Sequence, residues 1–183
     1  MTFGGADEFN LSCKCLEYLY KFSDRLTITI VLGSHYRFES EIQKLLARSS
    51  KHTVTIFRNV TEMAELMLSQ DMVVSAGGST LYELACLGIP TCSVVTAENQ
   101  RELVEQFAYH KAVISLGNVD HLSETEFTNT VLQMITSMEL RKMLSANARN
   151  LVDGLGSKRV AKYIINRING GIYTDGQPDS NRE

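Results

Sequence analysis

The sequence has no long apolar run and no excess of basic residues. None of its hydrophobic stretches approaches the roughly 18 consecutive apolar residues that a membrane-spanning helix needs. The 18 lysine and arginine residues are scattered and are outnumbered by 21 acidic residues, so nucleic-acid binding has little support. We therefore expect no membrane span and no nucleic-acid partner, and local groups must hold any anionic ligand.

Signals for secretion and for metal binding are also missing. The first residues, MTFGGADEFN, lack the basic-then-apolar order of a secretion signal, so we expect a soluble, cytoplasmic protein. No cysteines have CxxC spacing, and the histidines are isolated in the sequence. We expect no metal ion and no cofactor, and we expect reduced cysteines in or near the core at Cys13, Cys15, Cys86 and Cys92.

Two common nucleotide-binding motifs are absent. The pattern G-x-x-x-x-G-K-[ST] does not occur, which excludes a P-loop. Neither of two adjacent glycine pairs fits G-x-G-x-x-G, so a dinucleotide cofactor has weak support.

The chain is long enough for one sizeable core. It has 183 residues, of which 44% are hydrophobic, and this predicts one domain over residues 1–168. The last residues, NGGIYTDGQPDSNRE, are polar and rich in glycine, aspartate and asparagine. We expect residues 169–183 to form a disordered tail outside the functional part.

Short β-branched runs alternate with longer helical repeats along the chain, which predicts an α/β fold with a parallel, Rossmann-like sheet flanked by helices. The expected strands are residues 1–3, 26–32, 54–56, 72–75, 91–95 and 112–116. Helices are expected between them, and the rest of the chain is expected to be helical up to a break at GLGS. Ser123 and Glu126 have capping-box spacing at the start of that last helical part.

Paired glycines occur in two loops that follow expected strands. In a parallel sheet, ligands collect at the carboxyl ends of the strands, and glycines there let the backbone approach an oxyanion. The first turn of a following helix also favours negative charge. The two loops predicted to bind a phosphate-bearing ligand contain Gly4, Gly5, Asp7 and Asn10 in the first, and Gly78, Ser79 and Thr80 after Gly77 in the second.

Glu83 suggests that the ligand is a nucleotide. It lies four residues after Ser79, on the same helix face one turn further on. A carboxylate there cannot bind phosphate, but it can accept hydrogen bonds from the two hydroxyls of a ribose. Spacing alone leaves a second interpretation open, namely a tight corner with an N-cap serine and a solvated Glu83.

Four segments, taken together and in order, resemble a known family. They are TFGGADEFNL, SAGGSTLYELACLGIP, ENQ at residues 98–100, and DGLGSKRV at residues 153–160. Over residues 2–168 the chain resembles the carboxyl-terminal half of the UDP-sugar hydrolases of pseudaminic acid biosynthesis and of the related spore-coat polysaccharide proteins. These are similar in turn to the lipid II-forming N-acetylglucosaminyltransferase, which has the two-domain GT-B fold.

The resemblance implies a UDP site in this half. The glycine-rich loops would surround the diphosphate, and Glu83 would take the ribose hydroxyls. The segment FRNV, with Arg58 and Asn59, would lie where the backbone meets uracil. Asn99 and Gln100 would contact the sugar or its phosphate, although helix capping and surface polarity would also explain them.

The sequence departs from the family in its catalytic part. The family's general base is a histidine of an amino-terminal domain, and no histidine here lies in a corresponding motif, so we expect no catalytic residue. Three interpretations stay open. The chain is half of a UDP-sugar hydrolase, the donor-binding subunit of a split GT-B glycosyltransferase, or a non-catalytic nucleotide-sugar-binding module. Expected partners are UDP or a UDP-sugar, together with a separate amino-terminal-type domain or a further copy of the chain.

Overall fold

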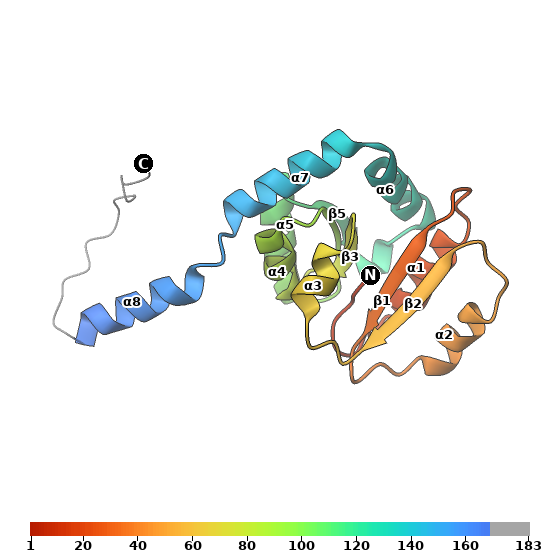
Figure 1. Cartoon of the computed structure of the whole chain (residues 1–183), viewed down its shortest axis with the longest axis horizontal. Coiled ribbons are helices and arrows are strands. Elements are labelled where there is room, and N and C mark those ends of the chain that lie inside the picture. The colour runs from red at the N-terminus through yellow and green to blue at the C-terminus, as the bar shows by residue number, and fades with distance from the viewer. Residues whose placement is uncertain (169–183) are drawn as a thin grey trace. The chain divides into compact units, whose positions relative to one another are not determined.

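The computed structural model describes residues 1–168 (Figure 1). These residues fall into two units. The first is Met1–Val152, and the second begins at Asp153 and contains helix α8, Gly156–Ile168. The tail expected at residues 169–183 lies outside the described residues.

The first unit is built on parallel strands. They are β1 (Thr27–Leu32), β2 (Thr53–Arg58), β3 (Val73–Ala76), β4 (Thr91–Val95) and β5 (Ile114–Asn118). Strand β1 pairs with β2, while β4 lies between β3 and β5, and every pairing is parallel. The α/β fold with a parallel sheet is therefore confirmed.

Residues 1–3 join the two groups of strands into one sheet. The N–H of Thr2 donates to the Val74 oxygen (3.0 Å), and the N–H of Ala76 donates to the Thr2 oxygen (3.2 Å). On the other side, the N–H of Val31 donates to the Met1 oxygen (2.9 Å). The order across the sheet is therefore β2, β1, residues 1–3, β3, β4 and β5, and the expected first strand is present as this short segment.

Helices cover both faces of this sheet (Figure 1). They are α1 (Leu11–Leu19), α2 (Glu39–Leu46), α3 (Met63–Leu68), α4 (Thr80–Leu87), α5 (Arg101–Tyr109), α6 (Glu124–Thr136) and α7 (Met138–Leu151), with 3₁₀ turns η1 (Glu98–Gln100) and η2 (Val119–His121).

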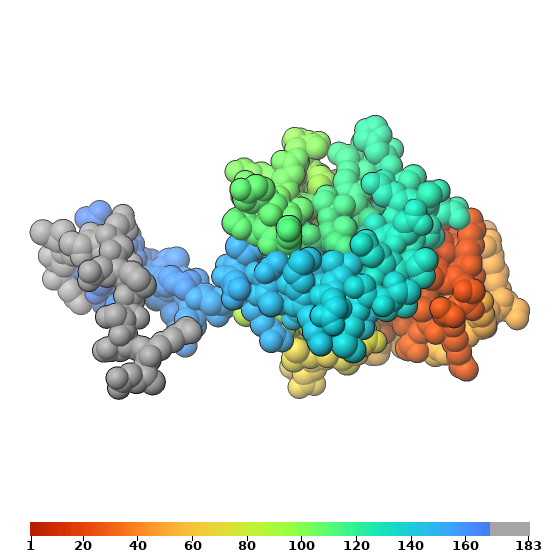
Figure 2. All heavy atoms as spheres, turned by 90° about the horizontal axis from the view of Figure 1, so that it is seen from above, coloured from red at the N-terminus to blue at the C-terminus, as the bar shows by residue number. Residues whose placement is uncertain are grey.

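The side chains of the strands alternate between the two layers of helices. Alternate strand residues such as Ile30, Leu32, Val74 and Val94 pack with α1, α2 and α6 in the main core. Residues of the opposite parity, such as Val73, pack with α3, α4 and α5. Figure 2 shows α6 and α7 at the surface of the first unit.

Strand β5 begins two residues later than the apolar pattern suggested. Lys111 adopts a left-handed conformation (φ 53°), and the N–H of Ala112 donates to the Phe107 oxygen (2.9 Å). These contacts terminate α5, so Ala112 and Val113 are buried by the end of the helix and not by strand pairing.

The helical part after β5 is divided at Ser137, which the sequence analysis did not anticipate. Ser137 follows α6 and also caps α7, because its hydroxyl accepts from the Leu140 N–H (3.2 Å). Ser123 caps α6 as predicted, since its hydroxyl accepts from the Glu126 N–H (3.2 Å). All four cysteines are free, and only Cys86 is not fully buried. Within residues 1–168, no helix has the length and apolar character needed to span a membrane.

Candidate functional site

The predicted ligand residues lie at or just beyond the carboxyl ends of neighbouring strands. Arg58 ends β2, and the first glycine loop follows residues 1–3. The second glycine loop follows β3, and residues 96–100 follow β4. Because the strands are parallel, these segments meet at one edge of the sheet, here called the carboxyl edge.

The first loop leaves open space beside its two glycines. Gly4 and Gly5 are exposed, and a β-carbon at either position would meet no atom within 4 Å. Gly4 has a φ of +82°, which a residue with a side chain rarely adopts. The loop therefore presents bare backbone to solvent at this edge.

Gly33, which was not among the predicted site residues, supports the first loop. It directly follows β1, and a β-carbon there would lie 2.3 Å from the Gly5 oxygen. The N–H of His35 donates to the same oxygen (3.0 Å). A third glycine after a neighbouring strand was visible in the sequence, but its partner is 28 residues away and only the sheet order brings the two together.

The two glycines of the second loop have different roles. A β-carbon on Gly77 would lie 2.3 Å from the Val104 side chain of α5, so Gly77 allows close packing between strand and helix. Gly78 is open, with only the Gln100 amide nitrogen 4.0 Å from the position of its β-carbon. Of the pair, Gly78 alone has space beside it for a ligand.

Helix α4 begins at this loop without a side-chain cap. Ser79 is the N-cap residue, and its hydroxyl makes no capping hydrogen bond, in contrast to the N-cap role that one interpretation of the sequence gave it. Within residues 1–168, the N–H groups of Gly78, Ser79 and Thr80 have no hydrogen-bond partner. Unpaired N–H groups at the positive end of the helix dipole are favourable for an anion.

Glu83 is exposed in the first turn of α4. It makes no ion pair with any residue of the described part of the chain. Its neighbour Tyr82 instead packs edge-on against Phe107 at 5.6 Å between ring centroids. The Glu83 carboxylate is therefore available to a ligand at the carboxyl edge.

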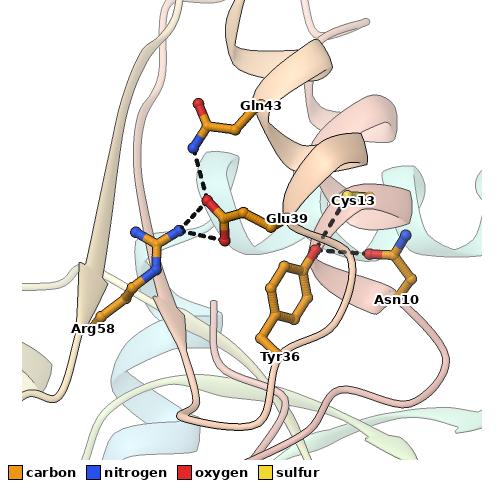
Figure 3. A network of polar contacts seen from close by, with 6 residues as sticks. All are labelled: Asn10, Cys13, Tyr36, Glu39, Gln43 and Arg58. Atoms are coloured by element: carbon orange, nitrogen blue, oxygen red, sulfur yellow. Dashed lines mark hydrogen bonds and ion pairs between the residues drawn. The ribbon is translucent and has the colours of Figure 1, made fainter.

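Asp7 and Asn10 are engaged in contacts within the protein. The Asp7 carboxylate is buried and accepts from the Leu11 and Ser12 N–H groups (2.8 and 2.9 Å), which satisfies the start of α1. The Asn10 amide oxygen accepts from the Tyr36 hydroxyl (2.9 Å), which also contacts Cys13 Sγ at 3.3 Å (Figure 3). Both residues therefore stabilise the first loop through contacts with α1 and Tyr36.

Arg58 is also occupied. Its guanidinium donates to both oxygens of Glu39 (2.7 Å each), and the same carboxylate accepts from Gln43 (2.9 Å; Figure 3). The hydrogen bonds from Gln43 and then Arg58 lower the pKa of Glu39. Asn59 is exposed and left-handed (φ 51°), so it turns the chain directly after β2.

Gln100 faces the second loop in a fixed orientation. Its amide oxygen accepts from the Thr96 N–H and from the Thr96 hydroxyl (3.0 Å each). Its amide nitrogen therefore lies on the side of Gly78 as a donor. Asn99 is exposed in η1, and no hydrogen bond holds its side chain within residues 1–168.

His52 and His35 lie in different environments. His52 is buried, accepts from the Leu26 N–H (3.1 Å) and stacks on Tyr20, which gives it a structural role. His35 is exposed beside the first loop, a position that the sequence analysis did not anticipate. No cluster of three potential metal ligands occurs within residues 1–168.

Comparison with known proteins identifies the family. Residues 1–162 match the glycosyltransferase family 28 C-terminal domain. The spore coat polysaccharide biosynthesis protein SpsG of Bacillus subtilis is 26% identical over 166 residues, which cover 90% of this chain and 48% of that protein. The protein MJ1062 of Methanocaldococcus jannaschii is 38% identical over 108 residues, 58% of this chain and 22% of its own length. This chain therefore spans about half or less of the length of these relatives.

Solved structures share the fold at low sequence identity. MurG of Acinetobacter baumannii superposes with a TM-score of 0.74 at 16% identity, over 90% of this chain and 48% of MurG. MnaA of S. aureus superposes with a TM-score of 0.72 at 13% identity, over 97% of this chain and 48% of MnaA. The fold is that of the carboxyl-terminal half of a GT-B protein, and the chain belongs to the glycosyltransferase family 28 C-terminal domain family.

Proposed function

We propose that the chain binds UDP or a UDP-sugar at the carboxyl edge of its sheet. The observation that carries this proposal is the row of unpartnered N–H groups at Gly78, Ser79 and Thr80, at the start of an uncapped helix. The first loop, with its exposed Gly4, follows the neighbouring strand and offers a second stretch of bare backbone. Two such loops suit the two phosphates of a nucleoside diphosphate.

Ligands named for the structural neighbours support this class. The MnaA structure is a complex with UDP, and the spinosyn rhamnosyltransferase SpnG, with a TM-score of 0.66, was solved with thymidine diphosphate. Both ligands are nucleoside diphosphates, and their sugars differ in the 2′-hydroxyl. This difference makes the ribose contact the sharpest test of the site.

Each predicted residue has a place in the proposal. The two loops hold the diphosphate, Glu83 accepts from the ribose hydroxyls, and the backbone near Asn59 meets the base. The Gln100 amide nitrogen, with Asn99 beside it, donates to the sugar or to the nearer phosphate. Because Asp7, Asn10 and Arg58 are already engaged within the protein, we assign them the support of these loops.

We further propose that the chain is the nucleotide-binding half of a UDP-sugar hydrolase in surface polysaccharide biosynthesis and works in the cytoplasm. The similarity to the spore coat protein SpsG favours that setting. A donor-binding subunit of a split GT-B glycosyltransferase fits the family equally, since the family model describes a carboxyl-terminal domain. In either case a separate amino-terminal-type domain, or a further copy of the chain, would complete the ligand site at the carboxyl edge.

Calorimetric titration with UDP and 2′-deoxy-UDP tests the ribose contact. Glu83→Gln keeps the shape of the side chain and removes its charge, so UDP affinity should fall by about 1 to 3 kcal/mol. The same substitution should lower the affinity for 2′-deoxy-UDP by a smaller amount, because that ligand offers only one of the two hydroxyls. Glu139→Gln, at an exposed acidic position in the first turn of α7, is the matched control and should change neither affinity.

Equal UDP affinity in Glu83→Gln and the parent chain would disprove the ribose contact. Titrations with ADP, GDP and CMP test the base, and equal affinity for all of them would contradict a uracil site. We also expect little or no hydrolysis of a UDP-sugar by the chain alone. Turnover that disappears in His35→Ala would overturn this expectation and identify His35 as the missing base.

A further inference from the structure

The proposed nucleotide site has many hydrogen-bond donors but little positive charge. Its two glycine-rich loops offer backbone N–H groups, and Glu83 adds a negative charge in the first turn of α4. A diphosphate is a multiply charged anion, and proteins commonly bind phosphate through arginine as well as through backbone donors. Cations at the carboxyl edge therefore decide how firmly such a ligand is held.

Three arginines lie at the carboxyl edge within residues 1–168. Arg37 belongs to the loop after β1, residues 33–38, here called the β1 loop, while Arg58 ends β2 and Arg101 begins α5 directly after η1. No lysine occurs in the segments that follow the strands at this edge. These arginines are therefore the source of permanent positive charge for a ligand there.

Among the described residues, two of these arginines are balanced by a carboxylate and Arg37 is not. Arg58 pairs with Glu39 at 2.7 Å, and Arg101 pairs with Glu98 at 2.9 Å. Arg37 is exposed, and its guanidinium makes no ion pair with any residue that the structure describes. Its charge is therefore available to a ligand.

The β1 loop is fixed against the first glycine loop. The N–H of His35 donates to the Gly5 oxygen (3.0 Å), and the Tyr36 hydroxyl donates to the Asn10 amide oxygen (2.9 Å; Figure 3). Arg37 directly follows these two anchored residues, so its main chain is held beside a loop that presents bare backbone. A side chain on an anchored segment loses less freedom when it binds a ligand than one on a mobile segment.

The side chains of the β1 loop differ in their surroundings. Tyr36 points toward α1, where Asn10 and Cys13 contact its hydroxyl (Figure 3). His35 and Arg37, which flank Tyr36 in the chain, are both exposed. The tyrosine therefore anchors the loop, and its two basic neighbours stay accessible.

His35 offers a hydrogen-bond donor from the same loop. Its ring Nδ1 lies 3.1 Å from the Ser34 hydroxyl, and its Nε2 has no hydrogen-bond partner within residues 1–168. When the hydroxyl donates to Nδ1, the hydrogen of the neutral ring is on Nε2. The N–H groups of Gly4 and Gly5 are also without a partner in this part of the chain, so two neighbouring loops both have donors available.

We propose that the β1 loop is a third ligand-binding loop of the carboxyl edge. Arg37 pairs with an oxygen of the phosphate that the first glycine loop holds, and His35 donates to the same phosphate through Nε2. The proposal rests on the proposed nucleotide site, and it supplies the positive charge that the two glycine-rich loops lack. Arg37 is thereby the ligand-binding arginine, whereas Arg58 supports its own loop through Glu39.

Calorimetric titration with UDP, uridine and inorganic pyrophosphate tests the contact. Arg37→Gln removes the charge, so the affinities for UDP and for pyrophosphate should each fall about tenfold, whereas the affinity for uridine should not change. Arg37→Lys keeps the charge without the planar pair of donors and should lose about threefold. His35→Gln should also weaken UDP and pyrophosphate by about threefold.

Arg25→Gln is the matched control. Arg25 is exposed just before β1, at the opposite, amino edge of the sheet, whereas Arg37 follows the same strand. The two substitutions make the same change in net charge, so Arg25→Gln should change UDP affinity by less than about twofold.

The outcomes separate this proposal from the proposed function. Equal affinities for UDP and pyrophosphate in Arg37→Gln and the parent chain would overturn the Arg37 contact and leave the nucleotide site standing. A loss that Arg25→Gln reproduces, or an equal loss for uridine, would also overturn it, because Arg37 would then act through net charge or through the shape of the site. A parent chain that binds pyrophosphate through Arg37 but binds no UDP would support the phosphate contact and contradict the proposed function. A parent chain that binds neither ligand would contradict both.

Discussion

Replacing Asp7 tests whether its carboxylate stabilises the fold or binds the ligand. Asp7 is 7% exposed, and its two oxygens accept from the Leu11 and Ser12 N–H groups at 2.8 and 2.9 Å. These two N–H groups belong to buried residues, so water cannot readily replace the carboxylate when it is removed. The first turn of α1 depends on a residue that lies outside the helix.

The magnitude follows from these contacts. A hydrogen bond to a charged group contributes about 1.5 to 3 kcal/mol, and the lower value suits two bonds that share one carboxylate. Asp7 also has a φ of 45°, which adds about 1 kcal/mol when alanine takes its place. We therefore expect Asp7→Ala to lower the free energy of unfolding by about 4 kcal/mol.

Urea unfolding followed by circular dichroism measures this loss, and the chain has no tryptophan whose fluorescence could serve instead. Asp7→Asn keeps one acceptor and tolerates the left-handed conformation, so it should lose roughly half as much. Glu8→Ala, at the exposed neighbouring position, should stay within about 0.5 kcal/mol of the parent chain. A loss below about 1 kcal/mol in Asp7→Ala would refute the capping argument. A folded Asp7→Asn chain with much weaker UDP binding would show that the carboxylate also contacts the ligand.

Three further predictions concern close packing and pH. Gly33→Ala places a β-carbon 2.3 Å from the Gly5 oxygen, so we expect a loss of about 2 to 3 kcal/mol in urea unfolding together with weaker UDP binding, and full retention of both would contradict the role of Gly33. Gly77→Ala should lower the free energy of unfolding by about 1 to 3 kcal/mol, because its β-carbon would lie 2.3 Å from the Val104 side chain. In a double-mutant cycle, Val104→Ala should relieve part of this loss, whereas strict additivity would show that the two side chains do not clash. The Met1 amine has its pKa lowered from 8.0 to about 6 by burial, so the unfolded chain binds more protons between these values. Stability should therefore rise by about 2 kcal/mol from pH 6 to pH 8, and amino-terminal acetylation should remove this amine's contribution to the slope.

Much of the fold follows from local patterns in the sequence. Alternating β-branched runs and helical repeats predict the parallel strands, because a strand and a helix bury their side chains with different periods. Signals that act within a few residues were also reliable. Ser123 caps α6 as its spacing with Glu126 predicts, and Gly88 ends α4 in a left-handed conformation (φ 71°).

Element boundaries that depend on neighbouring structure were less predictable. Strand β5 starts at Ile114 because the end of α5 takes up the preceding apolar residues, and nothing in their hydrophobicity distinguishes the two environments. The break at Ser137 was likewise hidden, since a serine between two helical repeats is common both inside a helix and at its end.

The sequence by itself indicated a candidate nucleotide site, because glycine pairs after strands and an acidic residue one turn into a helix are local features. The tertiary structure decided what each residue is free to do. Arg58 forms an ion pair with Glu39, and the Asp7 carboxylate accepts a hydrogen bond at the start of α1. Gly77 allows α5 to pack closely, whereas Gly78 has open space beside it. The contact between Gly33 and Gly5 depends on which strands are neighbours. Strand order joins residues that are far apart in the chain, and a pattern confined to a few neighbouring residues carries no information about it.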